Sequence, residues 1–251
     1  MKLKRIRNLA LAITATLPAL PLTLPATATA TLVTWDFQGS DAAAMLKSHT
    51  AVSGITALDI GLNNINQSNR INNIYTTTAL AVTPTSAQNA YDFSTAFGNA
   101  SYLSFSITIA DGYTLTLDTF SLQVASGAGS SPDTSVRAFY VLSSLTGFGN
   151  DENRILVKGA NTDGLPVRPV DKSLKDVSVT LSDPAFKGID SGNTIEFRIY
   201  IQCDGNTRAL DFDNVTLTGS LTAIPEPASA TLLPGLLACA CIGFLIIRRR
   251  W

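Results

Sequence analysis

The sequence predicts an all-β fold, a two-sheet antiparallel β-sandwich of jelly-roll-like type, with an N-terminal signal-peptide helix before it and a C-terminal transmembrane helix after it. Three observations predict the sandwich. Short runs rich in Thr, Val, Ile, Tyr and Phe alternate with period two, turn-forming residues separate these runs, and the body has no long run with a helical period. Many short strands with little helix pack as two sheets around one core.

The strand pattern recurs along the whole body of the chain. In chain order the runs are 32–37, 74–82, 102–110, 113–124, 136–143, 154–158, 176–182, 194–203 and 209–222. Residues 39–73 are rich in Asn and poor in apolar residues, so we expect a long excursion there, with one short helix within 41–49 and one short strand. Asp111-Gly112, between the third and fourth runs, is a typical signal of a tight hairpin.

Two runs change the parity of their apolar positions. In residues 113–124 the apolar positions are first odd and then even, and the change falls at Asp118-Thr119. In residues 209–222 they are first even and then odd, and the change falls at Asp213-Asn214. An extra residue in one strand produces such a change, so the sequence predicts a β-bulge or bend at both places.

Alternation also predicts which side chains face the core. Trp35 alternates with Val33 and Phe37, and Cys203 lies on the apolar face of residues 194–203, so both are expected to pack inward. Cys203 is the only cysteine between residues 31 and 222, so the body has no internal disulfide.

The N-terminal segment has the three parts of a secretory signal peptide. A basic start, MKLKRIR, precedes an apolar run from Leu9 to Leu24 and a small-residue stretch, ATATA. We expect cleavage after Ala30, which makes residues 1–30 the signal peptide and residues 31–222 an exported domain. The alternative is an uncleaved membrane helix, which the prolines in the run disfavour.

The net charge of residues 31–222 argues against two classes of binding partner. Residues 31–222 hold 11 Lys and Arg against 18 Asp and Glu, a net charge of −7, with no basic patch. This composition argues against binding to nucleic acid or to an anionic lipid surface. It is compatible with an extracellular medium and, more weakly, with calcium, which prefers oxygen ligands.

No motif for catalysis stands out. His49 is the only histidine of the chain, and no nucleophile turn, zinc-ligand set or phosphate-binding loop accompanies it. A glycosidase needs only two carboxyl groups. The body has only two glutamates, Glu152 in a loop-like stretch and Glu196 on the polar face of its strand, and both are explained more simply as solvated acids. We therefore expect that the protein is not an enzyme.

Two ligands remain open. Asp36 closes the first strand and Asp211, Asp213 and Asn214 lie at the kink of the last, so their oxygens could converge on one structural calcium ion if these strands are neighbours. The alternative is that they simply face water. Carbohydrate would need an exposed aromatic platform, and the weaker candidates for one are Tyr91, Tyr102, Tyr140, Phe148 and Tyr200, although most of them could be core residues.

The C-terminal segment, residues 223–251, has the features of a membrane anchor. An apolar stretch at about 229–247 can span a bilayer, and Arg248, Arg249 and Arg250 are expected to stay in the cytoplasm. Pro225 and Pro227 hold an extended, accessible stalk outside the membrane. The order of Pro225-Glu226-Pro227, apolar helix and arginine cluster resembles a PEP-CTERM sorting signal.

That resemblance implies a delivery route. It implies recognition of Pro225-Glu226-Pro227 by an exosortase, a transient partner, in the inner membrane of a Gram-negative bacterium that makes exopolysaccharide. The chain would be held in the membrane before processing and then released or attached at the outer surface. The body also resembles the sandwich domains that precede such tails, through TWDF at 34–37, SLTGF at 144–148, RIY at 198–200 and FDNVTLTG at 212–219.

Taken together, these features predict an exported, surface-sorted, non-enzymatic protein of the cell envelope or exopolysaccharide matrix. The alternative is a carbohydrate-binding module with a structural calcium ion, and exopolysaccharide is then a further partner. A glycan-active enzyme is the third possibility.

Overall fold

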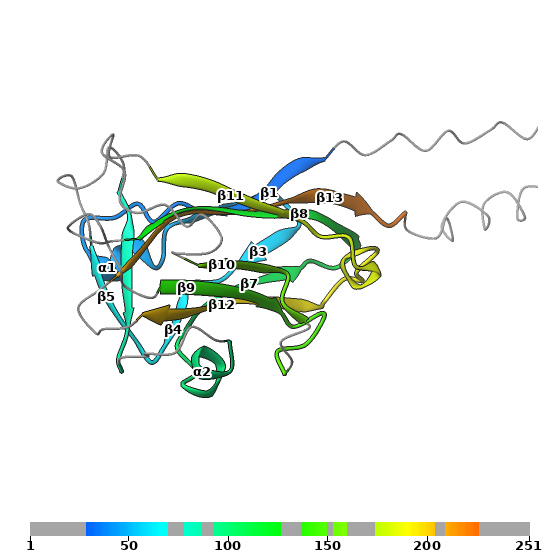
Figure 1. Cartoon of the computed structure of the whole chain (residues 1–251). Coiled ribbons are helices and arrows are strands. Elements are labelled where there is room, and N and C mark those ends of the chain that lie inside the picture. The colour runs from blue at the N-terminus through cyan, green and yellow to red at the C-terminus, as the bar shows by residue number, and fades with distance from the viewer. Residues whose placement is uncertain are drawn as a thin grey trace, which may run out of the picture.

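Two antiparallel sheets lie face to face in the computed structural model of the chain (Figure 1). The structure describes residues 29–69, 78–86, 93–126, 137–149, 153–159, 174–203 and 209–225. The first and last strands of the chain are direct neighbours in one sheet, as the calcium hypothesis requires, with Trp35 opposite Val215.

Sheet A contains seven strands. Its order is β11 (Lys175–Thr180), β8 (Tyr113–Ser126), β13 (Leu210–Ala223), β1 (Ala30–Trp35) and β2 (His49–Ala51), with β6 (Leu80–Pro84) on β13 and β5 (Ile65–Asn69) on β6. Sheet B contains six strands. Its order is β10 (Leu156–Gly159), β9 (Arg137–Ser143), β12 (Thr194–Cys203), β7 (Tyr102–Ile109) and β3 (Ile55–Ala57), with β4 (Gly61–Asn63) on β7.

All nine predicted strands are present, and the excursion is more ordered than predicted. Residues 39–69 contain helix α1 (Ala42–Met45) and four short strands, β2 to β5, where the sequence predicted a single strand. These strands are only three to five residues long, and an alternation of apolar and polar residues cannot be recognised over so few positions. Helix α2 (Phe93–Gly98) and the 3-10 helix η2 (Pro184–Phe186) were not predicted.

The Asp111-Gly112 hairpin prediction is wrong. Gly112 adopts a left-handed φ of 80°, so the turn itself is present. However, the turn joins β7 of sheet B to β8 of sheet A, and the two strands do not pair. The chain crosses from one sheet to the other here because both strands bury one face in the same core.

The two parity changes coincide with real irregularities in the pairing of β8 with β13. Thr119 is opposite Thr218 and Leu117 is opposite Gly219, so Asp118 is the extra residue in β8. The register also shifts between Asp213 and Thr216, where β13 holds one residue more than β8. Both bulges were predicted from the alternation of apolar residues alone.

Large aromatic side chains fill the space between the sheets. Trp35 is fully buried, as predicted, and its ring centre lies 5.3 Å from that of Phe105 in an edge-on arrangement. Its indole N–H donates to the Leu58 carbonyl oxygen at 3.0 Å. Phe197 of sheet B stacks on Phe120 of sheet A. Cys203 is buried in this core, as predicted.

Candidate functional site

The outer face of sheet B carries a group of aromatic side chains beneath helix α2. Strands β7, β9 and β12 place one tyrosine each on this face, because the residues that alternate with them point into the main core. Helix α2 adds two phenylalanines from above. We call this group the aromatic face, and its members are Phe93, Phe97, Tyr102, Tyr140, Phe148 and Tyr200.

The rings are in contact but are not equally accessible. Tyr140 and Tyr200 are only 2% exposed, and ring centres lie 5.3 Å apart between Phe93 and Tyr140. Phe97, Tyr102 and Phe148 are packed against this group but stay partly exposed. One part of the aromatic face is therefore a small second core under α2, and the other part is an accessible surface.

At the accessible part, Arg198 lies between two rings. Its guanidinium carbon is 3.9 Å from the ring centre of Phe148 and 4.6 Å from that of Tyr102. The same guanidinium donates twice to Glu196, from Nε to Oε1 at 2.8 Å and from Nη2 to Oε2 at 3.3 Å. We call Glu196, Arg198, Tyr102 and Phe148 the Arg198 cluster; it combines ring stacking with a two-point ion pair.

The pKa shifts show how firmly the pair is held. Partial burial opposes the charge of Arg198, but hydrogen bonds to Glu196 and Tyr200 outweigh it, and the pKa of Arg198 is raised. Burial raises the pKa of Tyr200, against the opposing effect of Arg198. The guanidinium of Arg198 therefore stays protonated beside Glu196, and the ion pair as a unit carries no net charge.

A short loop after β9 places Phe148 over Arg198. The loop turns at Gly147, whose left-handed φ of 90° favours glycine, and the Gly147 N–H donates to the Ser143 carbonyl oxygen at 2.9 Å. Ser144 and Glu196 bind each other twice, through Ser144 N–H to the Glu196 carbonyl at 2.8 Å and Glu196 N–H to Ser144 Oγ at 3.0 Å. SLTGF (144–148) and RIY (198–200) are two of the segments through which the body resembles other sandwich domains, and they meet at this cluster.

Polar groups extend the aromatic face on the side of β9. Arg154 lies 5.7 Å from the ring centre of Phe93 and 5.8 Å from that of Tyr140. The Tyr140 hydroxyl donates to Gln202 Oε1 at 3.2 Å, while the buried Gln202 Nε2 has no hydrogen-bond partner within the described segments. Arg154 also lines a pocket of about 320 Å³ between the edges of the two sheets, and Phe186 is another of its lining residues.

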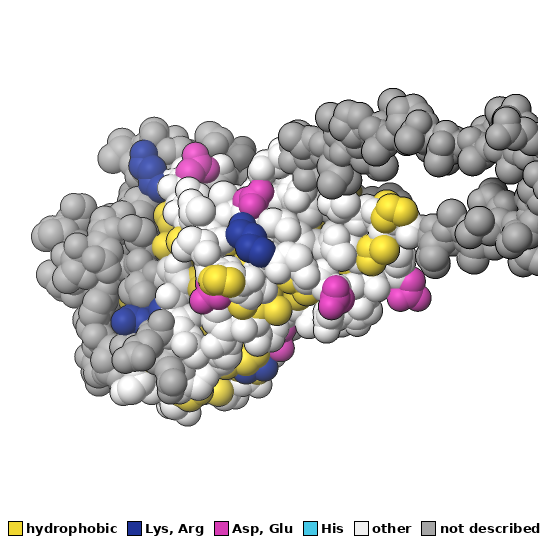
Figure 2. Space-filling view, turned by 90° about the vertical axis from the view of Figure 1, so that its right-hand side faces the viewer, with side chains coloured by type: hydrophobic (Ala, Val, Ile, Leu, Met, Phe, Trp, Pro, Cys, Tyr) yellow, Lys and Arg dark blue, Asp and Glu magenta, His cyan; other side chains and the backbone are white. Residues whose placement is uncertain are grey.

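The outer face of sheet A is different in character. A shallow groove of about 440 Å³ crosses β11, β8, β13 and β1, and its lining is dominated by hydroxyl and amide side chains without any aromatic ring. Asn214 bridges it, with Nδ2 donating to Gln123 Oε1 at 2.9 Å. Figure 2, which shows the molecule turned by 90° from Figure 1, has a surface mostly of backbone and uncharged polar side chains, with single charges of both signs and scattered hydrophobic side chains. Such a surface can offer hydrogen bonds but no stacking platform.

The four residues proposed for calcium do not form a ready ion site. Asp36 Oδ1 accepts hydrogen bonds from Ser48 Oγ and from the Gln38 N–H. Asp213 and Asp211 are buried, and the Asp213 carboxylate accepts from both nitrogens of Asn214. Within the described residues no three His, Cys, Asp or Glu side chains are arranged to hold a metal.

The fit to calcium is therefore poor, because carboxylate oxygens of Asp36 and Asp213 are already engaged within the chain. The calcium site stays a prediction. We expect EDTA to leave the melting temperature of the protein unchanged. A clear drop in melting temperature that added calcium reverses would restore the site.

The residues considered for catalysis are also engaged elsewhere. His49 Nε2 lies 3.6 Å from Asp59 Oδ1, and the neighbouring Ser48 hydroxyl donates to Asp36 and not to the imidazole. Glu196 is bound to Arg198, and Glu152 lies outside the described residues. The imidazole of His49 is therefore paired with Asp59, while the neighbouring hydroxyl of Ser48 is bound to Asp36.

Most of the predicted sorting signal cannot be placed. Pro225 is the last described residue and is exposed. Glu226, Pro227, the helix at about 229–247, Arg248, Arg249 and Arg250 lie outside the described residues, as do residues 1–28 of the signal peptide. In the part of the chain that is described, no helix is long and apolar enough to cross a membrane.

Sequence reasoning found some members of the aromatic face and missed others. Tyr102, Tyr140, Phe148 and Tyr200 were named as weak carbohydrate candidates, and the structure brings all four together; Tyr91 lies outside the described residues. Arg198 was not singled out. The only available signal was its place on the polar face of a strand, between Glu196 and Tyr200.

Comparison with known proteins gives only distant similarity. No family model and no curated protein matches the chain. The xylan-binding CBM22-1 domain of Xyn10C from Paenibacillus barcinonensis is 12% identical, with a TM-score of 0.36 over 78% of this chain and 97% of that one.

An arabinose-bound GH51 α-L-arabinofuranosidase is 11% identical, with a TM-score of 0.38 over 74% of this chain and 25% of that one. A Stig cyclase from Fischerella sp. TAU is 13% identical, with a TM-score of 0.30 over 82% and 93%. At these TM-scores the similarities carry no argument about activity or ligand.

Proposed function

We propose that this chain is an exported, non-enzymatic protein of the cell envelope or exopolysaccharide matrix, whose β-sandwich binds polysaccharide through the Arg198 cluster. In this proposal the signal peptide directs export, the apolar segment at about 229–247 holds the chain in the inner membrane, and an exosortase processes it at Pro225-Glu226-Pro227 for delivery to the outer surface.

The observation that supports binding is the composition of the Arg198 cluster. Tyr102 and Phe148 are partly exposed rings, and a sugar ring can lay its apolar C–H face on such a ring. Glu196 accepts and Arg198 donates hydrogen bonds at the same place, and both side chains are about a quarter exposed, at 29% and 24%. A few oriented polar groups beside aromatic rings are the usual composition of a ligand site.

The ion pair also suits binding better than catalysis. A glycosidase acid must hold a proton at the working pH. Both carboxylate oxygens of Glu196 accept hydrogen bonds from the guanidinium of Arg198, so the carboxyl group is held in the ion pair. A carboxyl group that is held by a neighbouring guanidinium can orient the hydroxyl groups of a ligand, but it is not free to act as a proton donor to a leaving group.

Binding to soluble polysaccharides tests the first part of this proposal. The full chain, purified in detergent, is run in affinity gels that contain neutral or uronate-rich polysaccharide. We expect Phe148→Ala to weaken retention at least tenfold. The matched control is Tyr113→Ala, a half-buried aromatic residue on the opposite sheet.

The salt dependence distinguishes a neutral ligand from an acidic one. Because Glu196 and Arg198 form a neutral unit, we expect retention to change little between low salt and physiological salt. If no polysaccharide retains the protein, or if Phe148→Ala and Tyr113→Ala are retained like the wild type, the Arg198 cluster is not a glycan site. The protein would then be left with a purely structural role.

Sorting is tested separately. Replacing Pro225, Glu226 and Pro227 with alanine should leave an unprocessed, membrane-held chain, which is detected by its size in membrane fractions. Normal processing of this variant would contradict the sorting proposal without affecting the binding result.

A further inference from the structure

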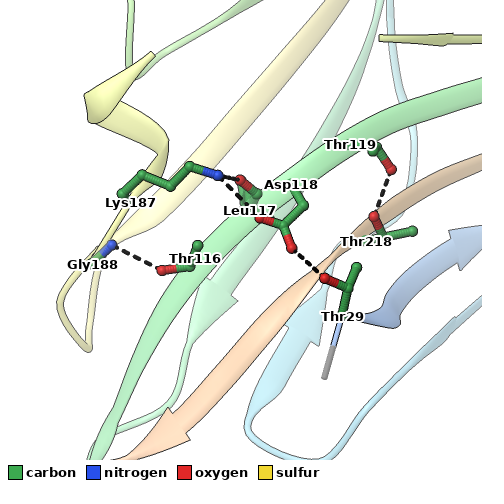
Figure 3. A network of polar contacts seen from close by, with 8 residues as sticks. All are labelled: Thr29, Thr116, Leu117, Asp118, Thr119, Lys187, Gly188 and Thr218. Carbon is green, nitrogen blue, oxygen red and sulfur yellow. Dashed lines mark hydrogen bonds and ion pairs between the residues drawn. The ribbon is translucent and has the colours of Figure 1, made fainter. Parts of the chain in front are cut away.

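The start of strand β1 is fixed by a polar network on the outer face of sheet A. Thr29 Oγ1 donates to Asp118 Oδ2 at 2.8 Å, and Lys187 Nζ lies 3.0 Å from Asp118 Oδ1 and 2.7 Å from the Leu117 carbonyl oxygen (Figure 3). Asp118 is the extra residue of the β8 bulge, so its side chain stands at a break in the pairing. The network thus joins β1, β8 and the segment after η2.

Neighbouring contacts hold this network in place. Gly188 N–H donates to Thr116 Oγ1 at 3.2 Å, and the hydroxyls of Thr119 and Thr218 lie 2.5 Å apart (Figure 3). The Leu181 N–H donates to the Asp118 carbonyl oxygen at 2.8 Å. Apart from Thr29, therefore, the side chain of Asp118 is bound by Lys187 and its backbone by Leu181.

The residues just before β1 offer two bonds to a signal peptidase. The enzyme requires small residues one and three places before the cut. Ala26 and Ala28 satisfy this for the bond between Ala28 and Thr29, and Ala28 and Ala30 satisfy it for the bond between Ala30 and Thr31. The sequence pattern alone does not separate the two.

The fold separates them, because it uses residues that the second cut removes. Ala30 is the first residue of β1 and pairs with Gly219, and Thr29 contributes its hydroxyl to Asp118. A cut after Ala30 would delete both contacts and shorten the strand. A cut after Ala28 leaves the strand complete and makes the residue bonded to Asp118 the first residue of the mature protein.

We infer that signal peptidase cuts between Ala28 and Thr29, and that Asp118 then holds the new N-terminus of the mature protein. This inference rests on the proposed export. Water adds across the Ala28–Thr29 amide, so that Ala28 leaves as a carboxylate and the Thr29 nitrogen becomes an ammonium group. This nitrogen is three bonds from the hydroxyl that donates to Asp118, which places the new positive charge beside a carboxylate.

The first experiment identifies the N-terminus. The full chain is expressed in a Gram-negative host, and the exported protein is analysed by intact mass and N-terminal sequencing. We expect the sequence to begin TATLVTW, at Thr29. A start at Thr31 overturns this inference but leaves export intact, whereas a start at Met1 overturns the proposed export itself.

The second experiment tests the role of Asp118 in the mature protein. The pKa of the α-amino group is measured by NMR after isotopic labelling of the terminal amine. We expect a value above that of an ordinary terminal amine in the wild type and a fall towards the ordinary value in Asp118→Asn. The control is Asp190→Asn, which changes an exposed aspartate in the loop between η2 and β12 and should leave the pKa of the α-amino group unchanged. Equal values in all three proteins would show that Asp118 does not hold the N-terminus.

Discussion

Gly219 shows how a single position limits the sequence of the last strand. A Cβ atom built at this position would lie 2.0 Å from the Thr116 carbonyl oxygen and 3.0 Å from Leu117 Cα. These are backbone atoms of β8, so they cannot rotate away. The closeness arises where the register of β13 shifts around the Asp118 bulge.

We therefore expect Gly219→Ala to lower the free energy of unfolding by about 2–3 kcal/mol, because the two strands must move apart. Urea denaturation measures the effect. Gly98→Ala is the matched control, since a Cβ there meets nothing within 4 Å. If both variants unfold at the same urea concentration, β8 and β13 are not packed as closely as described.

The carboxyl group of Asp118 should make the stability of the protein depend on pH. The hydrogen bond from Thr29, followed by that from Lys187, lowers the pKa of Asp118 below its ordinary value. A lowered folded pKa means that the ionised carboxylate stabilises the fold above about pH 4, and that this contribution is lost as the pH falls through the folded pKa. The effect should stay below about 1 kcal/mol, because the pair is largely screened by solvent.

The measurement is the melting temperature between pH 7 and pH 2 for the wild type and Asp118→Asn. We expect the variant to melt lower at pH 7 and the two curves to converge in acid. A constant difference at every pH would mean that the carboxylate charge contributes nothing and that only the shape of the side chain matters.

At the scale of elements, the alternation of apolar residues was the most informative part of the sequence. It predicted nine strands and both bulges. Successive side chains of a strand point to opposite faces of the sheet, so a strand with one buried face has an apolar residue at every second position. It failed for β2 to β5, which are too short, and for Asp111-Gly112, where the turn is local but the choice of partner strand depends on the whole core. Helix α2 was missed because it is only six residues long, and its apolar side comprises only Phe93, Ala96 and Phe97.

The bulge of β13 depends on Asn214, which combines two roles. Its backbone is left-handed, with φ of 49°, and its side-chain amide donates to Gln123 Oε1 at 2.9 Å and to Asp213 Oδ2 at 3.2 Å. Asparagine tolerates the left-handed region better than other residues with a Cβ, except aspartate. Two substitutions separate these roles.

We expect Asn214→Ala to destabilise the protein by about 1–3 kcal/mol, since it loses the hydrogen bonds and strains the backbone. Asn214→Gly should cost less, because glycine accepts this φ and loses only the hydrogen bonds. Chemical denaturation ranks the three proteins. If glycine is no better than alanine, backbone strain at the bulge is not what selects asparagine.

At the scale of the whole molecule, the candidate site was harder to predict than the fold. Phe148 and Arg198 are fifty positions apart, and their contact depends on a loop that is held to β12 through Ser144 and Glu196. Alternation shows that Arg198 faces outward, but not what lies above it. The aromatic candidates could be named from the sequence, whereas the arginine between them required the pairing of β9, β12 and β7.

The sandwich should unfold as one unit, because a single core joins both sheets. Phe197 of β12 stacks on Phe120 of β8 at 5.4 Å and on Phe186 of η2 at 6.3 Å, so it links the two layers. We expect Phe197→Ala to lower the free energy of unfolding by about 3–5 kcal/mol. Trp35 is fully buried and reports the core by fluorescence, once the second tryptophan is removed by Trp251→Phe.

The fluorescence transition of Trp35 should coincide with the loss of strand signal in circular dichroism, in the Trp251→Phe protein and in its Phe197→Ala variant. Phe148→Ala, which removes a ring from the outer surface of sheet B, should shift both transitions far less, since Phe148 lies outside the main core. Two separate transitions would show that the sheets unfold independently. A large shift for Phe148→Ala would show that the Arg198 cluster contributes to folding and would make its loss of polysaccharide binding a consequence of instability.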